Sequence, residues 1–171
     1  MSTPRFVLEL REKIGHDPLW MPGVKGVVLR GAGAEREVLL VQRRDNGRWT
    51  VPAGIIEPGE EPGDAIEREV QEETGVHARV CRLVGVSTTA PTEYPNGDRA
   101  QYLDVIMALE PLGGDARVND DENVAVAWRR VDALEDVPPL HVRAVRWALE
   151  AEHDAAGRFV ADGTERSGPV A

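Results

Sequence analysis

The chain has 171 residues, of which 42% are hydrophobic and 29% charged, a composition typical of a soluble globular domain rather than a disordered segment. The 30 Asp and Glu residues outnumber the 20 Lys and Arg residues, and the formal net charge of −10 argues against binding to nucleic acid polymers or acidic membranes. Cys81 is the only cysteine, which excludes an internal disulfide, and with no secretory signal or membrane-length apolar run the sequence predicts a cytoplasmic protein.

Hydrophobic periodicity and turn residues predict the secondary structure along the chain. In chain order, the expected elements are a helix at 5–15, two paired strands at 23–31 and 36–44, an extended segment at 48–57, a helix at 62–75, long strands at 76–89 and 99–112, a strand at 123–131 and a helix at 140–154.

This order of elements predicts a mixed β-sheet flanked by helices, an α+β fold of the α/β/α sandwich kind. We expect an N-terminal helical extension at residues 1–20 and one domain at residues 21–153. Residues 154–171 are expected to form a weakly ordered C-terminal tail.

The segment GIIEPGEEPGDAIEREVQEETGV (54–76) carries seven Glu and one Asp in a chain that is already acidic. A charge-rich helix is commonly a solvated surface. At about 100° per residue, however, Glu69 and Glu73 fall inside the arc of the apolar residues, and Glu72 falls near its edge. The remaining polar residues already supply an outer face, so we expect Glu69 and Glu73 to point toward the protein interior.

Two inward carboxylates one helical turn apart either have raised pKa values or share a cation. Hard divalent cations prefer carboxylate oxygens, and Mg²⁺ usually binds through one or two carboxylates, water and substrate phosphates. The pattern therefore predicts a site for Mg²⁺ that attracts a phosphate group.

The same residues resemble the Nudix box at each of its specified positions, which here are Gly54, Glu60, Arg68–Glu69–Val70, Glu72–Glu73 and Gly75–Val76. The resemblance extends over about residues 20–150 and implies a Nudix-like mixed sheet between helices, with the box as a loop–helix–loop. It also implies Mg²⁺- or Mn²⁺-dependent hydrolysis of a nucleoside diphosphate linked to another group.

The resemblance implies that Glu69 and Glu73 ligate the metal and that Glu72 ligates it or polarises water. The backbone carbonyl of Gly54 is expected to be a further ligand. Glu122 stands six residues before Trp128 at a spacing similar to that of an extra metal-ligating Glu in MutT-type members. We therefore expect the catalytic residues to be Glu69, Glu72 and Glu122, with the general base in the box or at Glu122; a solvated acidic turn is the alternative for Glu122.

Three other box residues are expected to be structural. Glu60 and Arg68 are predicted to fix the loop against the helix by an ion pair, although a direct catalytic role remains open for them. Gly75 is predicted to end the helix in the left-handed conformation.

The substrate-binding predictions rest on residues outside the box. Arg44 and Arg48, with Arg43 beside them, are expected to contact phosphate. Tyr94 is expected to stack on a base, and Asp98 lies on the same Pro-Asn-Gly turn; a plain hairpin loop is the alternative for both.

Residues after the box also bear on substrate class. Pro91 lies 15 residues beyond Val76, as in ADP-ribose-type members, whereas Tyr94 lies 18 beyond it, as in dinucleoside-polyphosphate members. We expect a small nucleotide substrate, ADP-ribose-like first. The alternatives are a MutT-type nucleoside triphosphate or dinucleoside polyphosphate hydrolase and, in another class, a non-catalytic nucleotide sensor. A homodimer is possible by resemblance alone, and the four His residues have no metal-ligand spacing.

Overall fold

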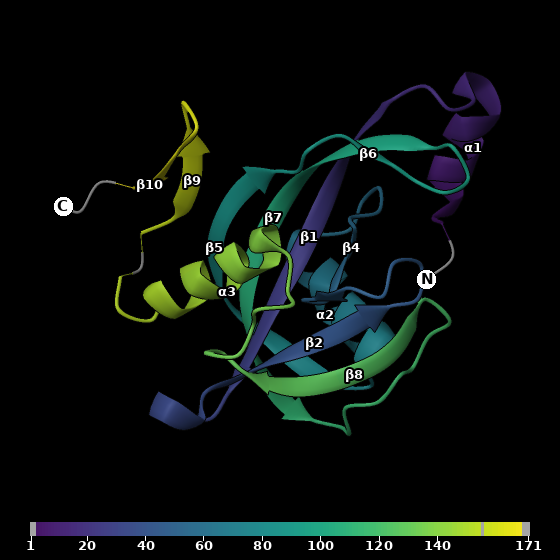
Figure 1. Cartoon of the computed structure of the whole chain (residues 1–171). Coiled ribbons are helices and arrows are strands. Elements are labelled where there is room, and N and C mark those ends of the chain that lie inside the picture. The colour runs from purple at the N-terminus through teal and green to yellow at the C-terminus, as the bar shows by residue number, and fades with distance from the viewer. Residues whose placement is uncertain (1–2, 155, 169–171) are drawn as a thin grey trace.

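The computed structural model describes residues 3–154 and 156–168 (Figure 1). Its elements are α1 (Arg5–Ile14), β1 (Leu19–Arg30), the 3-10 turn η1 (Gly33–Glu35), β2 (Glu37–Arg43), β3 (Trp49–Thr50), β4 (Ala53–Ile55), α2 (Pro62–Thr74), β5 (His77–Thr88), β6 (Thr92–Glu93), β7 (Arg99–Gly113), β8 (Asn123–Arg130), α3 (Pro139–Glu150), β9 (Arg158–Ala161) and β10 (Thr164–Ser167).

The strands form one mixed sheet in the order β10-β9-β5-β7-β1-β2-β3, with β4 paired to β1, β6 to β7 and β8 to β2. Strand β1 is central and is buried on both faces from Val24 to Leu29, as expected for a strand covered on each side. It runs parallel to β7 from Leu19↔Ala100 to Val28↔Leu109, while β7 pairs antiparallel with β5.

Helices cover both faces of the sheet (Figure 1). Ala65, Ile66 and Val70 of α2 pack on one face with Val24 and Val28 of β1. On the other face, Ala144, Val145, Trp147 and Ala148 of α3 pack with residues such as Val27, Leu29 and Ile106. The predicted α+β sandwich is confirmed.

The predicted pairing of the strands near 23–31 and 36–44 is only partly present. Strands β1 and β2 share two register pairs, Leu29↔Val38 and Arg30↔Glu37, and β2 then pairs with β8 over most of its length. The long partner of β1 is β7, far away in sequence. Turn residues are a local signal, so the sequence predicted the turn between the two strands. It did not predict the parallel pairing of β1 with β7, because the two strands are distant in sequence.

Helix α1 packs at the N-terminal end of β1, where Val7 forms a small core with Met21 and Ala100. Arg11 and His16 both contact the carboxylate of Asp98, at 3.1 and 2.9 Å. The N-terminal segment is therefore fixed to the β6–β7 loop.

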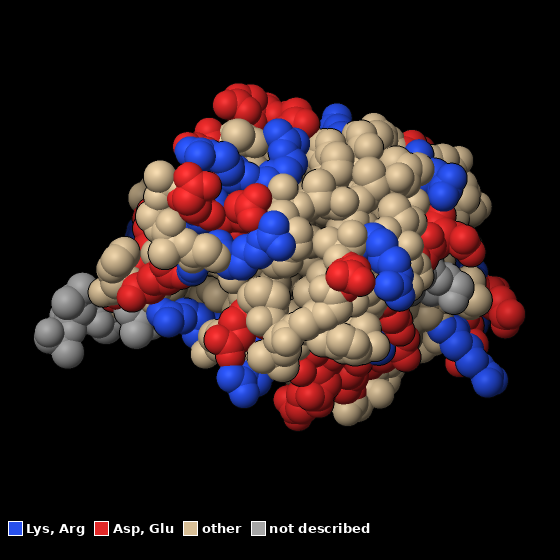
Figure 2. Space-filling model, turned by 90° about the horizontal axis from the view of Figure 1, so that it is seen from below, with Lys and Arg blue, Asp and Glu red and all other residues tan. Residues whose placement is uncertain are grey.

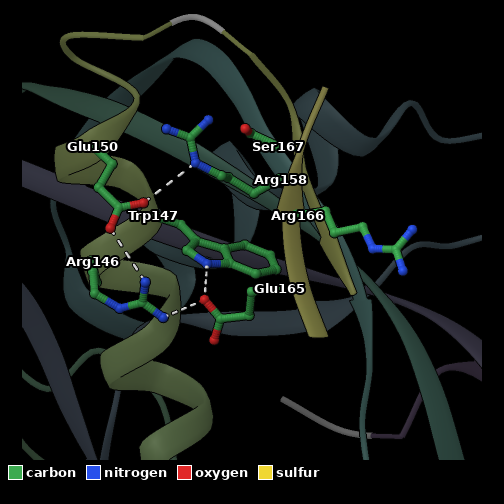
Figure 3. A pocket seen from close by; sticks show the side chains of 7 residues that line it. All are labelled: Arg146, Trp147, Glu150, Arg158, Glu165, Arg166 and Ser167. Carbon is green, nitrogen blue, oxygen red and sulfur yellow. Dashed lines mark hydrogen bonds and ion pairs between the residues drawn. The ribbon is translucent and has the colours of Figure 1, made fainter. Parts of the chain in front are cut away.

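The predicted weakly ordered tail is wrong for residues 158–167. They form the β9–β10 hairpin, in which β9 lies parallel to β5 through Gly85↔Arg158 and Val86↔Phe159. Figure 3 shows the contacts of the hairpin with α3: Glu165 accepts hydrogen bonds from Arg146 and from the Trp147 indole (3.0 Å), while Arg158 donates to Glu150 (3.3 Å).

The pairing of β9 with β5 joins residues far apart in sequence, so the short polar segment gave no local signal of it. The seven residues drawn in Figure 3 line a cavity of about 250 Å³ between α3 and the hairpin.

Replacing Gly85 by Ala should detach this hairpin. A Cβ at Gly85 would lie 2.4 Å from the Arg158 carbonyl oxygen, and a backbone atom cannot move aside without loss of the β5–β9 pairing. We expect destabilisation of about 1–3 kcal/mol and faster amide hydrogen exchange over residues 158–167. Gly113→Ala is the matched control because a Cβ there meets nothing within 4 Å. Unchanged exchange in Gly85→Ala would contradict the described docking.

Figure 2 shows one face on which Lys and Arg side chains lie in separate groups beside Asp and Glu, with a contiguous acidic group at one edge. No helix in the described part of the chain is long and apolar enough to span a membrane.

Candidate active site

Helix α2 carries the predicted acidic residues on the predicted faces. It starts with Pro62 in its first turn and ends at Gly75, which has a φ of 71° and donates its N–H to the Gln71 carbonyl. Glu69 is fully buried and Glu73 is 5% exposed, whereas the Glu72 side chain is 50% exposed. The expected inward orientation of Glu69 and Glu73 is confirmed.

Gly54 of β4 lies directly against the Glu69 carboxylate. Gly54 is the register partner of Val24 in β1, and the Val24 side chain packs against α2. A Cβ at Gly54 would lie only 2.0 Å from Oε1 of Glu69. Only a glycine leaves room for the carboxylate at this point of the strand.

Arg68 lies on the outer side of the carboxylate cluster, which consists of Glu69, Glu72 and Glu73. Arg68 pairs with Glu60 in bidentate fashion, Nε to Oε1 at 2.8 Å and Nη2 to Oε2 at 2.9 Å, and Glu60 also accepts the N–H of Glu57. The predicted ion pair between loop and helix is therefore present. Nη1 of Arg68 donates to Glu69 Oε1 at 2.9 Å and to Glu72 Oε2 at 3.3 Å.

The two buried carboxylates, Glu69 and Glu73, have raised pKa values, and each has one oxygen without a hydrogen-bond partner among the described residues. Burial raises the pKa of Glu69 to about 7, although Arg68 opposes the shift. Burial, together with the negative charges of Glu69 and Asp120, raises the pKa of Glu73 well above its ordinary value. Oε2 of Glu69 and Oε2 of Glu73 are both buried, and neither has a hydrogen-bond partner among the described residues.

These orphaned oxygens fit a hard divalent cation, since such an ion takes carboxylate and carbonyl oxygens and neutralises paired charges. With the side chains as they stand, no group of three His, Cys, Asp or Glu among the described residues is arranged to hold an ion. One reason is visible at Arg68, which engages one oxygen of Glu69 and one of Glu72. To bind a metal through these two oxygens, Glu69 and Glu72 would have to release Arg68.

The acidic loop before β8 lies near the cluster. Asp120 raises the pKa of Glu73, and its carboxylate accepts the backbone N–H and side-chain amide of Asn123 at 3.0 and 2.9 Å. The sequence had favoured Glu122, which is half-buried and interacts electrostatically with Arg43. Proximity of Asp120 to Glu73 depends on the loop path, and no spacing rule in the sequence indicated it.

The arginines near the site have different environments. Arg43 forms a bidentate ion pair with Asp45, at 3.0 and 2.9 Å, and its charge also lowers the pKa of Glu73. Arg44 donates to the carbonyls of Asp121 and Asn123, so it ties β2 to the acidic loop. Arg48 is exposed, and its backbone N–H bonds Asn46.

The two predicted substrate residues of the β6–β7 loop, Tyr94 and Asp98, both have contacts within the protein. The Tyr94 hydroxyl bonds that of Tyr102 at 2.8 Å, and its ring packs against the small core under α1. The Asp98 carboxylate is held by Arg11, His16 and Asn96. Both side chains help to hold the N-terminal segment, and their substrate roles stay predictions.

Comparison with known proteins identifies the family of this chain. The family model described as "NUDIX domain" matches residues 20–148. The chain belongs to the NUDIX domain family. By family the chain is a Nudix hydrolase, and α2 is its Nudix helix.

Named relatives and a solved structure agree. A "MutT-like protein" of Streptomyces ambofaciens is 35% identical over 70% of each chain. An "ADP-ribose pyrophosphatase" of Methanocaldococcus jannaschii is 32% identical over 53% of each chain. The crystal structure of a UDP-X diphosphatase superposes with a TM-score of 0.66 at 19% identity, covering 91% of this chain and 74% of that one, which shows the shared fold.

Without metal, this Nudix domain should lose stability as pH rises. The pKa of Glu69 is about 7 in the folded protein against 4.5 ordinarily, so the folded form holds this proton more tightly than the unfolded chain. The free energy of unfolding in EDTA should therefore fall between about pH 4.5 and pH 7, by about 1.4 kcal/mol per unit of pKa difference. Thermal melts across this range check it. Glu69→Gln should make the fall shallower, with the remainder due to Glu73, whose pKa is also raised. An equally steep fall in that variant would refute the assignment.

Proposed function

We propose that this chain is a divalent-metal-dependent hydrolase that cleaves the pyrophosphate bond of a nucleoside diphosphate derivative, with an ADP-ribose-like substrate favoured. The observation that carries the proposal is the pair of buried glutamates, Glu69 and Glu73, each with an unpartnered carboxylate oxygen. A purely structural site would not retain two such oxygens, because each unmade hydrogen bond costs about 1–3 kcal/mol.

Four groups on β4 and the Nudix helix would hold Mg²⁺ or Mn²⁺: the carboxylates of Glu69, Glu72 and Glu73 and the Gly54 carbonyl. Glu122 is a further candidate ligand from the loop. When bound, the metal supplies charge neutralisation at the pyrophosphate and a water nucleophile active near neutral pH.

Side chains of the protein are assigned to proton transfer and to positioning. Glu72 is the proposed proton acceptor, because it is half-exposed and can reach both the cluster and a bound substrate. Glu122 is the alternative base. Before metal binds, Arg68 holds Glu69 and Glu72 through the two hydrogen bonds of Nη1, and Glu60 holds Arg68. Metal binding would release Glu72 from Arg68.

Arg43 and Arg48 are the proposed contacts for substrate phosphate. Arg43 lies close enough to Glu73 to lower its pKa, and Arg48 is exposed on the loop that joins β2 to β3. Arg44 is the third proposed contact; its guanidinium, like that of Arg43, already has partners within the protein.

Two lines favour an ADP-ribose-like substrate: the position of Pro91 after the box and the similarity to the archaeal relative named ADP-ribose pyrophosphatase. The second candidate is a MutT-type nucleoside triphosphate hydrolase, which the Streptomyces relative's name favours. We place the protein in the cytoplasm, acting on a small nucleotide rather than a nucleic acid polymer, with a homodimer as a possible state.

A single panel of substrates separates these alternatives. The protein is incubated with Mg²⁺ and ADP-ribose, dinucleoside polyphosphates, nucleoside triphosphates or CDP-choline, and the products are identified. Release of AMP and ribose 5-phosphate from ADP-ribose is the expected result. Faster turnover of triphosphates to monophosphates would favour the MutT-type function. Thermal stabilisation by a nucleotide without any product would instead indicate the non-catalytic sensor.

A further inference from the structure

A second cavity lies where strand β1 ends. It has a volume of about 420 Å³, within the range of about 300–1,000 Å³ that is typical of small-molecule sites. Its lining residues on β1 begin at Leu29, five residues beyond Val24, the register partner of Gly54. Five residues of strand span about 16 Å, so this cavity is separate from the carboxylate cluster. We call it the β1-end cavity.

The inner wall of the β1-end cavity is apolar. Four buried side chains, which also belong to the cores on the two faces of the sheet, line it: Leu29, Ala108, Leu109 and Ala148. Because β1, β7 and α3 hold these side chains in place, the wall is preformed and offers a surface to an apolar group.

Charged side chains line the rest of the cavity. Both lining glutamates have an arginine partner, and the lining Arg30 has a glutamate partner: the pairs are Glu152 with Arg36, Glu110 with Arg79 and Glu37 with Arg30. Arg82 also lines the cavity, and none of the described carboxylates forms an ion pair with it. The cavity therefore carries an uncompensated positive charge in a chain whose net charge is −10.

The guanidinium of Arg82 has one edge without a partner among the described residues. Nη1 donates to the carbonyl of Ala151, at the end of α3, which fixes the orientation of the group. The other edge consists of Nε and Nη2, and it matches the two oxygens of a carboxylate or phosphate group. The same edge binds a carboxylate through both nitrogens elsewhere in this chain, in the pairs Arg43 with Asp45, Arg68 with Glu60 and Arg130 with Asp132.

An irregularity in β5 brings two consecutive side chains to this cavity. Consecutive residues of a regular strand point to opposite faces, so Cys81 and Arg82 would not line the same cavity. The register of β5 with β7 passes from Val80↔Leu109 to Arg82↔Ala108 and leaves Cys81 as an extra residue. A β-bulge of this kind re-aims a side chain and is common beside functional sites. Both Cys81 and Arg82 therefore line the cavity.

The cavity between α3 and the β9–β10 hairpin differs in this respect. Its three arginines are each paired with a carboxylate: Arg146 with Glu165, Arg158 with Glu150 and Arg166 with Asp162. The β1-end cavity, in contrast, offers an unpaired cation to a ligand.

We propose that the β1-end cavity binds a small organic anion. The carboxylate or phosphate group of this anion binds the Nε–Nη2 edge of Arg82, and its apolar body packs against Leu29 and Leu109. A bare inorganic anion would leave the apolar wall uncovered, whereas a neutral apolar compound would leave Arg82 without a partner. The proposal does not rest on the proposed function, because the cavity shares no residue with the carboxylate cluster.

The test uses two anions and a neutral analogue of one of them. 4-Phenylbutyrate, phenyl phosphate and 4-phenylbutanol are titrated into the protein in EDTA, which excludes binding through a metal at the carboxylate cluster. Amide NMR should show saturable shifts centred on Arg82, Leu109 and Ala148 with at least one anion. The neutral alcohol should bind at least about tenfold more weakly. The tighter of the two anions identifies the preferred head group, carboxylate or phosphate.

Arg82→Gln should weaken binding of that anion about tenfold or more, while the introduced amide can still donate to the Ala151 carbonyl. Arg5→Gln is the charge-matched control, because Arg5 lies on α1 and its side chain is 91% exposed. This control should leave the affinity unchanged. Equal affinity in Arg82→Gln and wild type overturns the proposal.

Cys81 gives a second readout that needs no variant, because it is the only cysteine and lines the cavity. The bound anion should slow alkylation of the Cys81 thiol by N-ethylmaleimide severalfold, and 4-phenylbutanol at the same concentration should not. Absence of saturable shifts with both anions, equal binding of the neutral alcohol or an unchanged alkylation rate overturns the proposal. Inorganic phosphate that binds as tightly as phenyl phosphate also overturns it, because the apolar wall would then play no part.

Discussion

Replacing Glu73 by Gln should reduce metal-dependent pyrophosphate hydrolysis roughly 10³-fold while leaving the fold intact. The amide has nearly the shape of the carboxylate but cannot bind a divalent cation with comparable strength. Because Glu73 is buried and its pKa is raised by that burial and by Glu69 and Asp120, the neutral amide should also raise the metal-free melting temperature near pH 8. Activity assays with ADP-ribose and thermal melts in EDTA measure both effects.

Asp64→Asn provides the control, because Asp64 lies in the first turn of the same helix and is exposed. It removes one negative charge without touching the cluster and should retain wild-type activity. Full hydrolysis by the Glu73→Gln variant would show that the chemistry does not depend on the buried pair.

Gly54→Ala should impair both stability and activity. The added Cβ would lie 2.0 Å from Oε1 of Glu69 and 2.1 Å from its carboxyl carbon, so either β4 or the Nudix helix must move. Overpacking of this kind costs about 1–3 kcal/mol. Because the same displacement moves Glu69 relative to the Gly54 carbonyl, we expect a loss of at least about 10²-fold in turnover. Chemical denaturation and steady-state kinetics with Mg²⁺ measure the two effects.

Gly63→Ala is the natural comparison within the same box. Gly63 lies in the first turn of α2, and a Cβ there meets nothing within 4 Å. The substitution should stabilise the helix by up to about 1 kcal/mol and leave catalysis intact. If Gly54→Ala behaved like Gly63→Ala, the close approach of β4 to Glu69 would not matter for function.

The local parts of the site were predictable from the sequence. The apolar residues of α2 fix which side of the helix is buried, and that alone indicated the inward position of Glu69 and Glu73. Gly75 at the helix end followed from the preference for glycine there, and the Glu60–Arg68 ion pair was implied by the resemblance to the Nudix box. Each of these features is decided within about one or two helical turns, where sequence spacing and spatial proximity coincide.

The non-local parts were not predictable. The parallel pairing of β1 with β7 and the docking of the β9–β10 hairpin join segments separated by dozens of residues. For the same reason, the sequence did not indicate that Asp98 contacts Arg11 and His16 of the N-terminal segment.

The most direct test of the account is a crystal of this protein soaked in Mn²⁺ and examined by anomalous diffraction. An anomalous peak bonded to Glu69, Glu73 and the Gly54 carbonyl, with Glu72 released from Arg68, is the predicted result. A well-ordered crystal with no peak there, in which Arg68 still engages Glu69 and Glu72, would contradict it.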